Sequence, residues 1–98
     1  MKIKEGVIMQ GLQLEMREVL KCADQVWKSL KQELVVTSAL DGTHSAGSYH
    51  YFGYALDFRT NYFTPNEKKQ AARDLRLMLS AKYFVLEESN HIHVQYNK

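Results

Sequence analysis

The sequence predicts an α+β domain in which two helices pack on one face of a small, mostly antiparallel sheet. Two observations lead to this prediction. Apolar residues recur at steps of three and four in two separate segments, and short β-branched or alternating runs lie between and after them. The chain has 98 residues, 45% hydrophobic and 24% charged, which is enough for one globular domain with one modest core, residues 1–98.

The first helix is expected over about residues 12–32. It follows residues 1–11, which have the character of a short extended arm or edge strand that ends at Gly11. Trp27 is expected to anchor the core, and Cys22, the only cysteine, to be a small buried hydrophobic residue. The helical apolar positions are Leu12, Met16, Val19, Leu20, Ala23, Val26, Trp27 and Leu30.

The second helix has a clear start signal. Thr64 is a suitable N-cap, Pro65 suits the first helical position, and Glu67 completes a capping box. We expect this helix to run to about Ser80.

Four runs predict the core strands. Residues 34–37 are rich in β-branched side chains, and residues 54–60 alternate along a strand. Residues 82–87 and 91–97 are separated by three turn-forming residues and predict a hairpin. Residues 38–50 are rich in Ser, Gly, Asp and Thr and are expected to be a functional loop, because a loop of this length is unusual in so small a domain.

Composition weighs against two classes of partner. The net charge is only +2 and the Lys and Arg residues are scattered, so no nucleic-acid partner is expected. No segment approaches the roughly 20 apolar residues of a membrane span, and residues 1–12 lack the apolar run of an export signal. We therefore expect no membrane span and a protein that is cytoplasmic at synthesis.

The polar pattern that stands out is a histidine, a carboxylate seven residues later, and a distant His-x-His. In a strand over 54–60, Asp57 faces the same way as Arg59, and His91 and His93 share a face of the last strand. Two imidazoles and one carboxylate form a common catalytic zinc set, which leaves the fourth tetrahedral position open for water. His50, Asp57 and this strand therefore predict a zinc site on the sheet face away from the helices.

These residues also resemble a known family. The stretch Asp41–Thr60, with Ser48-x-His50-x-x-Gly53-x-Ala55-x-Asp57, resembles the SxHxxGxAxD signature of the LAS-type zinc peptidases. That superfamily includes D-alanyl-D-alanine carboxypeptidases, phage L-alanyl-D-glutamate endolysins and the hedgehog signalling domain. The segment Leu86–Val94 is similar to the matching C-terminal half, and the overall pattern is most similar to small phage-encoded members.

Carried over position by position, the resemblance implies that His50, Asp57 and His93 are the zinc ligands. Gly53 would allow a tight turn where a side chain would obstruct the site. Ser48 would support the loop by hydrogen bonding.

The resemblance implies the other catalytic residues with alternatives. His44 and His91 match positions that line such sites, where either one orients water or stabilises an oxyanion. Many family peptidases carry their general base three residues before the last ligand, where this chain has Asn90. We favour Glu87, six residues before, because that match needs no gap; Glu88 suits a register in which His91 is the ligand.

The leading hypothesis is a zinc-dependent peptidase that hydrolyses amide bonds of peptidoglycan stem peptides. The resemblance implies a phage or prophage lysis or cell-wall enzyme that a holin releases to the wall. The alternative is a catalytically inactive, hedgehog-like zinc-binding interaction module, which Asn90 favours. A third hypothesis is a metal-free domain with incidental histidines. Arg59 is equally consistent with an ordinary surface residue and with a partner of Asp57 or of a substrate carboxylate.

Overall fold

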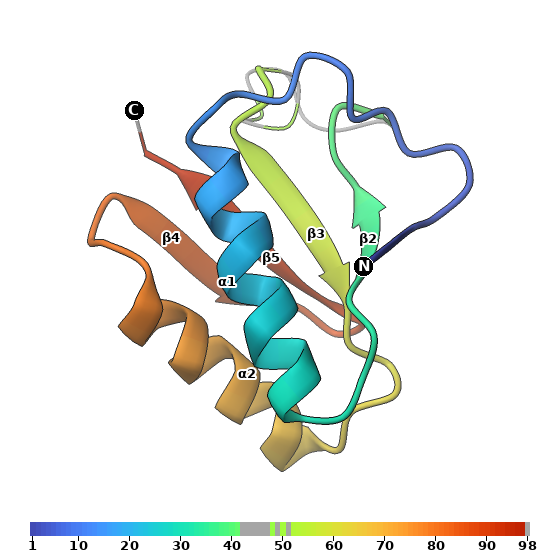
Figure 1. Ribbon diagram of the computed structural model, residues 1–98, viewed down its shortest axis with the longest axis vertical. Coiled ribbons are helices and arrows are strands. Elements are labelled where there is room, and N and C mark those ends of the chain that lie inside the picture. Colours follow the sequence, from blue (N-terminus) through green and yellow to red (C-terminus); the bar gives the residue numbers. More distant parts are fainter. Residues whose placement is uncertain (42–47, 49, 51, 98) are drawn as a thin grey trace.

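The computed structural model describes residues 1–41, 48, 50 and 52–97, and within these it contains two helices and one five-stranded sheet (Figure 1). The spatial order of the strands is β1-β2-β3-β5-β4. The α+β prediction is therefore confirmed. The elements along the chain are β1 (Lys2–Ile3), α1 (Met16–Ser29), β2 (Val35–Ser38), β3 (Ala55–Arg59), α2 (Pro65–Met78), β4 (Tyr83–Glu87) and β5 (His91–Tyr96).

The sheet is mixed rather than purely antiparallel. β2, β3, β5 and β4 pair antiparallel, as predicted, but β1 pairs parallel to β2 through Lys2↔Val35 and Ile3↔Val36. A parallel pair needs a long crossover connection, and here α1 provides it between β1 and β2. An edge strand within residues 1–11 was predicted, but its parallel pairing was not, so the sheet is mixed instead of mostly antiparallel.

The helix α1 is shorter at both ends than the predicted 12–32. At its start, the backbone N–H of Gln13 donates to Gly53 O at 3.0 Å, and its side chain donates to Phe52 O. These bonds hold the residues before Met16 in turns instead of a helix. At its end, Lys31 adopts a left-handed conformation with φ of 61°, which terminates a helix.

The helix α2 begins where the capping box predicts. Thr64 Oγ1 accepts from the backbone N–H of Glu67 at 3.2 Å, and Glu67 Oε1 accepts from the backbone N–H of Thr64 at 2.8 Å. This reciprocal pair satisfies two of the N–H groups that a helix start leaves without partners. The helix ends at Met78, two residues before the expected end.

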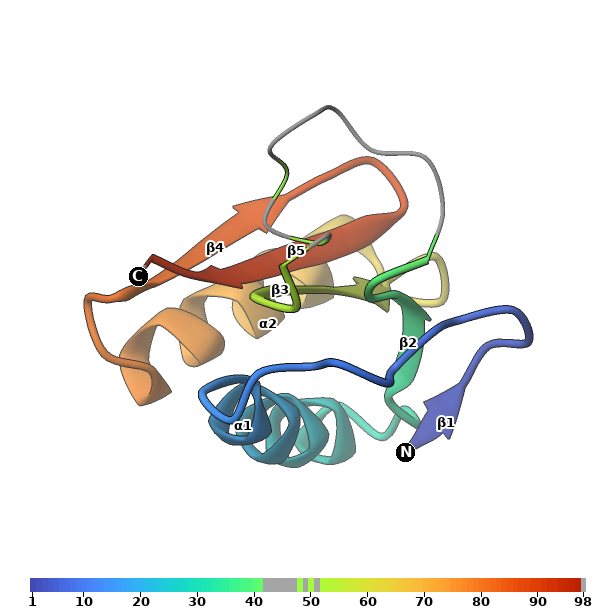
Figure 2. The same cartoon turned by 90° about the horizontal axis from the view of Figure 1, so that it is seen from above.

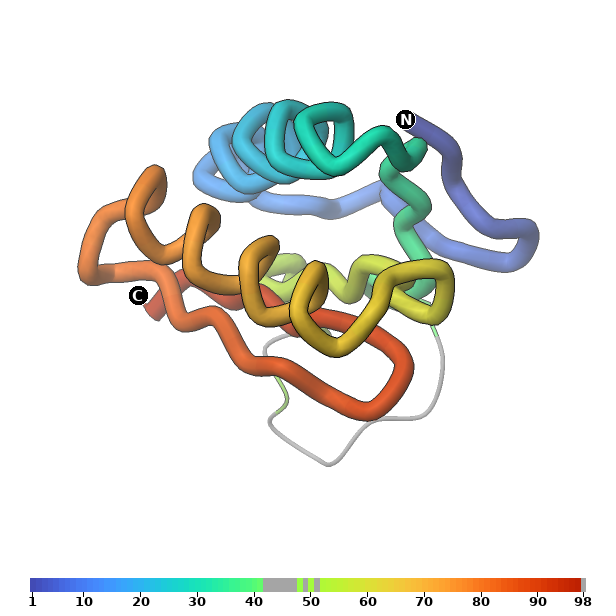
Figure 3. Tube along the Cα trace, turned by 90° about the horizontal axis from the view of Figure 1, so that it is seen from below, coloured from blue at the N-terminus to red at the C-terminus, as the bar shows by residue number. Residues whose placement is uncertain are grey.

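Both helices cover the same face of the sheet, which Figure 2 shows from one side. They lie side by side and run in roughly opposite directions, as Figures 1 and 3 show. Trp27 is fully buried between the layers, with its ring against Phe58 and Phe63 at centroid distances of 5.8 and 5.4 Å. Cys22 is also buried in this core, as predicted.

Neither helix has the length and apolar character that crossing a membrane would require, as judged on the described residues.

Candidate metal centre

The central pair of the candidate site is Asp57 on β3 and His93 on β5. The two residues lie directly opposite each other in the sheet register. Their neighbours Phe58 and Ile92 are fully buried under the helices. Because successive side chains of a strand point to opposite faces, Asp57 and His93 lie on the face that the helices leave open. This confirms the predicted separation of the polar cluster from the helices.

His50 reaches the same place from the turn before β3. Its backbone N–H donates to Ser48 Oγ at 3.3 Å, and the N–H of Gly53 donates to His50 O at 3.1 Å. Gly53 adopts φ of +77°, and a Cβ there would collide with the backbone oxygen of Gly11. The tight turn was predicted, but the obstacle to a side chain is the segment before α1, not the site itself.

Three ligand-type atoms converge. His50 Nε2 lies 3.2 Å from His93 Nδ1 and 3.3 Å from Asp57 Oδ1, and His93 Nδ1 lies 2.9 Å from the same oxygen. Zinc–nitrogen and zinc–oxygen bonds of about 2.0–2.2 Å make a tetrahedron with edges of about 3.4 Å. The three separations therefore match one face of such a tetrahedron, and this group can hold a metal ion.

The outer nitrogens of both histidines point at acceptors. His50 Nδ1 donates to Ala39 O at 2.7 Å, and His93 Nε2 donates to Gln95 Oε1 at 2.8 Å. The Gln95 amide is itself oriented, because its Nε2 donates to Asn97 Oδ1 at 3.0 Å. With these protons directed outward, the neutral histidines turn their lone pairs toward Asp57. Such outer hydrogen bonds are a general feature of metal-bound histidines.

The charge states of the three side chains depend on one another. If both histidines are neutral and donate their N–H groups outward, three acceptor atoms face one another, so a hydrogen bond to Asp57 requires a protonated histidine. Burial by itself raises the pKa of Asp57, but hydrogen bonds from His50 and His93 outweigh it and hold that pKa far below its usual range. Burial lowers the pKa of His93, but the hydrogen bonds to Asp57 and Gln95 and the charges of Asp57 and Glu88 raise it above its ordinary value. The site therefore favours a cation, either a proton or a metal ion.

His91 lies at the edge of this cluster. Its Nε2 is 3.8 Å from Asp57 Oδ2, too far for a hydrogen bond, and its Nδ1 donates to Asn90 Oδ1 at 2.7 Å. The neutral form therefore has no second hydrogen to direct toward the cluster. His91 becomes a donor to a developing oxyanion only when it is protonated.

The two candidate general bases, Glu87 and Glu88, occupy different positions relative to the sheet. Glu87 pairs with Ile92 and shares its face with Val85, so it lies on the face that carries the core. Glu88 follows the strand, and its charge acts on His93. Lys68 of α2 holds this turn by donating to Glu88 O at 3.1 Å. The register thus favours Glu88 over Glu87.

Two further outcomes concern residues around the cluster. His44 lies outside the described residues. Gln95 and the carbonyl of Ala39, which orient the histidines, were not predicted as part of the site. Gln95 stands two residues after His93, and this spacing on a strand is the signal that would have placed both on one face.

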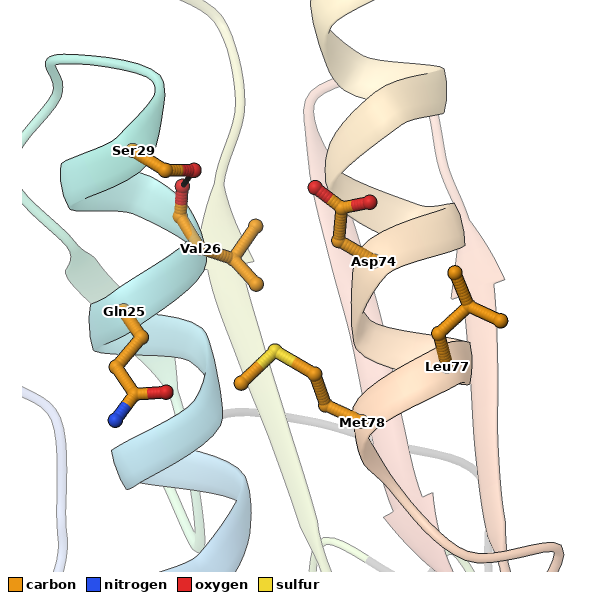
Figure 4. Close-up of a pocket in the computed structure, with 6 residues that line it drawn as sticks. All are labelled: Gln25, Val26, Ser29, Asp74, Leu77 and Met78. Atoms are coloured by element: carbon orange, nitrogen blue, oxygen red, sulfur yellow. Dashed lines mark hydrogen bonds between the residues drawn. The ribbon is translucent and has the colours of Figure 1, made fainter.

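A separate hollow lies between the two helices (Figure 4). Its volume is about 290 Å³. Among the described residues that line it, Asp74 is the only titratable one, and its Oδ1 accepts from Gln70 Nε2 at 2.9 Å. This hollow therefore carries none of the convergent chemistry of the cluster. It is lined by Gln25, Val26, Ser29, Asp74, Leu77 and Met78.

Comparison of the chain with protein-family models, with curated proteins and with solved structures gave no match.

Proposed function

We propose that this chain binds one zinc ion through His50, Asp57 and His93 and hydrolyses an amide bond in peptidoglycan stem peptides. The observation that carries the proposal is the convergence of Nε2, Oδ1 and Nδ1 within 2.9–3.3 Å of one another. Zinc suits this donor set, since imidazole and carboxylate are among its usual ligands. Three protein ligands, rather than four, are typical of catalytic zinc sites.

Zinc in such a site lowers the pKa of a coordinated water toward about 7 and polarises a carbonyl group. The residues of the chain supply the rest. Glu88 takes the proton of the attacking water and passes it to the leaving amine. His91, in its protonated form, stabilises the negative charge that develops on the carbonyl oxygen.

The peptide substrate is supported by the motif resemblance. The signature from Ser48 to Asp57 supplies two of the three converging atoms, and the segment Leu86–Val94 supplies the third. The resemblance to phage-encoded cell-wall peptidases extends over both segments, which points to the stem peptides of peptidoglycan.

The first experiment is metal analysis of the purified chain beside His50→Ala and Asp57→Ala. We expect one zinc per chain in the wild type and none in either variant. No metal in the wild type, even after zinc is added, would contradict the proposal at its base.

The second experiment separates binding from catalysis. Zinc-loaded protein is incubated with purified cell wall, and released amino groups are measured for the wild type, Glu88→Gln and Glu87→Gln. We expect Glu88→Gln to keep its zinc and lose about 10²–10⁴-fold in rate, the usual contribution of a general base. Glu87→Gln is the matched control and should hydrolyse normally.

The second candidate function is a zinc-binding interaction module without peptidase activity. The observation in its favour is Asn90, which stands where many family peptidases carry their base and whose side chain accepts from His91 Nδ1. A chain that binds zinc tightly but leaves cell wall untouched, with identical results for both glutamate variants, would establish this alternative.

A further inference from the structure

The N-terminal segment, residues 4–13, lies against the two stretches of chain that lead into the metal cluster. It crosses the end of the sheet at which β2 ends and β3 begins (Figure 1). Late in this segment, the N–H of Gln13 donates to Gly53 O at 3.0 Å, in the turn that follows His50. Earlier in the segment, Ile8 bonds to the residues directly after β2. The segment therefore supports the surroundings of His50 at two points.

A chain of hydrogen bonds runs from this segment to the His50 ring. His50 Nδ1 donates to Ala39 O at 2.7 Å. The N–H of the same peptide unit belongs to Leu40, and it donates to Ile8 O at 3.0 Å. One peptide group thus accepts from the histidine and donates to the N-terminal segment. Hydrogen bonds that are linked in this way polarise and strengthen one another.

The side chain of Asp41 holds this chain of bonds together. Its Oδ1 accepts from the backbone N–H of Ile8 at 3.0 Å and from that of Ala39 at 2.9 Å. A carboxylate oxygen has lone pairs for both donors. The two bonds form a clamp between Ile8 and Ala39, the residues whose carbonyl groups accept from Leu40 and from His50.

The hydrogen bond from His50 determines which of its ring nitrogens faces the cluster. Ala39 is fully buried and His50 has only 3% of its surface exposed, so water has little access to this bond. While Nδ1 keeps its hydrogen, the neutral ring has its lone pair on Nε2, the atom that lies 3.3 Å from Asp57 Oδ1. A displaced Ala39 carbonyl would no longer favour this tautomer, and a hydrogen on Nε2 excludes a metal ion from that atom.

We propose that Asp41 is a positioning residue of the candidate metal site. By holding Ile8 and Ala39 together, it fixes the hydrogen of His50 on Nδ1 and directs Nε2 at the cluster. The N-terminal segment is then part of the site, although none of the three converging atoms comes from it. This inference rests on the proposed function only for the identity of the metal ion.

The first measurement is the tautomer of His50, read from the NMR shifts of its ring nitrogens in the metal-free, full-length protein at alkaline pH, where imidazole rings are neutral. We expect the hydrogen on Nδ1 in the wild type and a mixture of tautomers in Asp41→Ala. Asp41→Asn keeps an oxygen in the same place and should restore the wild-type tautomer. Asp41→Gln moves that oxygen by one methylene and should resemble Asp41→Ala, which keeps the test decisive if Asp41→Ala does not fold.

The second measurement is the affinity for zinc, determined by competition with a chelator. We expect Asp41→Ala to bind zinc about 10–100-fold more weakly, the usual cost of losing a group that orients a metal ligand. Asp41→Asn should bind zinc like the wild type. Asp74→Ala is the matched control, because it changes the net charge equally and its carboxylate bonds to Gln70 on α2. It should leave both the tautomer and the zinc affinity unchanged.

The third measurement follows the same coupling from the N-terminal segment. Because coupling between two sites is reciprocal, a clamp that strengthens zinc binding must itself be stabilised by zinc. Zinc should therefore slow hydrogen exchange at the amides of Ile8 and Leu40 by the same factor of about 10–100. This slowing should exceed any change at Leu79, whose N–H bonds within α2, and it should be lost in Asp41→Ala.

Three results would overturn the inference. The first is a His50 tautomer that is unchanged in Asp41→Ala. The second is a loss of zinc affinity in Asp41→Asn as large as in Asp41→Ala, since the charge and not the shared acceptor would then be the cause. The third is an equal effect of Asp74→Ala.

The two proposals fail separately. A chain that takes up no zinc, but whose His50 tautomer depends on Asp41, contradicts the proposed function and supports the clamp. A chain that binds zinc and hydrolyses cell wall, with the wild-type tautomer in Asp41→Ala, does the reverse.

Discussion

The two faces of β3 and β5 are made from alternate residues of the same two segments, yet they obey different physical requirements. On one face Leu56, Phe58, Ile92 and Val94 are fully buried beneath α1 and α2. On the other face Asp57 and His93 lie within 2.9 Å of each other, and His93 donates to Gln95 Oε1 at 2.8 Å. The apolar face is filled by the packing of the helices, whereas the polar face brings together three side chains that could hold a metal ion.

The comparison predicts that adjacent substitutions on β3 have different consequences. Phe58→Ala should lower the free energy of unfolding by about 3–5 kcal/mol, the usual cost of deleting a buried phenyl ring. This is a large part of the roughly 5–15 kcal/mol that stabilises a typical domain. Urea unfolding of the metal-free protein measures it.

Asp57→Ala is the matched control on the other face. It should abolish zinc binding and cost less unfolding free energy than Phe58→Ala in the metal-free protein, because the core stays intact. Equal losses for the two variants would show that the polar cluster is part of the folding core and would break the comparison.

The face-by-face organisation was predictable because it depends on local patterns. The alternation in residues 54–60 correctly predicted that the side chains of Asp57 and Phe58 point to opposite faces of the sheet. The capping box at Thr64 and Glu67 correctly predicted where α2 begins. The limits of α1 depend on contacts distant in sequence, above all the bond from Gln13 to Gly53, which no local pattern indicates.

The group that could hold a metal ion was also accessible from the sequence, since His50, Asp57 and His93 are the three predicted residues that converge. The choice between Glu87 and Glu88 as general base stays a prediction, because counting along a motif does not show to which face of the strand each side chain points. Once β4 and β5 are paired, Glu87 shares the face of Ile92. The clamp at Asp41 joins Ala39 to Ile8, which stands 33 residues before Asp41, so only the tertiary structure brings them together.

Zinc should stabilise the protein through the polar face alone. An ion that binds only the folded state raises the free energy of unfolding by about 2.7 kcal/mol at a hundredfold excess over its Kd. We expect this increment in the wild type and none in His93→Ala, as measured by thermal unfolding with and without zinc.

His91→Ala is the control that sharpens this result, because His91 is not among the three converging atoms. It should keep most of the zinc increment. An increment lost equally in both variants would make His91 a ligand and would require a different arrangement of the site.

The turn that carries His50 can be tested with two glycines of similar conformation. Gly53 and Gly6 both have positive φ, +77° and +90°, but a Cβ at Gly6 meets no atom within 4 Å. Both alanine variants pay the cost of a left-handed residue, about 1–2 kcal/mol. Gly53→Ala should lose more stability, since it also displaces Gly11, and it should weaken zinc binding by moving His50.

The measurement is zinc affinity beside unfolding free energy for both variants. Gly6→Ala should leave zinc affinity unchanged. If Gly53→Ala binds zinc with the affinity of the wild type, the turn around Gly53 does not position His50. Zinc binding would then depend less on this turn than its hydrogen bonds indicate.

The smallest expected effect concerns how the free energy of unfolding depends on pH. We expect the metal-free protein and the stabilisation added by zinc to respond to a rise in pH with opposite signs. Without metal, His93 has a raised pKa, so its contribution to stability is complete below the unfolded value of about 6.5 and is lost as the pH rises through the folded pKa. Asp57 has a lowered pKa, so its contribution is present above about 3.9 and is lost in more acidic solution. The pair therefore stabilises the metal-free protein most between about pH 4 and 6.5.

Zinc binds histidine only in its neutral form and so competes with protonation of His93. The stabilisation that zinc adds should therefore grow as the pH rises over the range where the metal-free pair weakens. Unfolding curves at several pH values, with zinc or with a chelator, give the two slopes. His93→Gln should remove both, because it lacks the titrating group and the Nδ1 ligand. A wild-type protein whose stability has the same pH slope with and without zinc would mean that the proton and the metal do not compete for one site, and the polar face would then not be the single cation site that its geometry indicates.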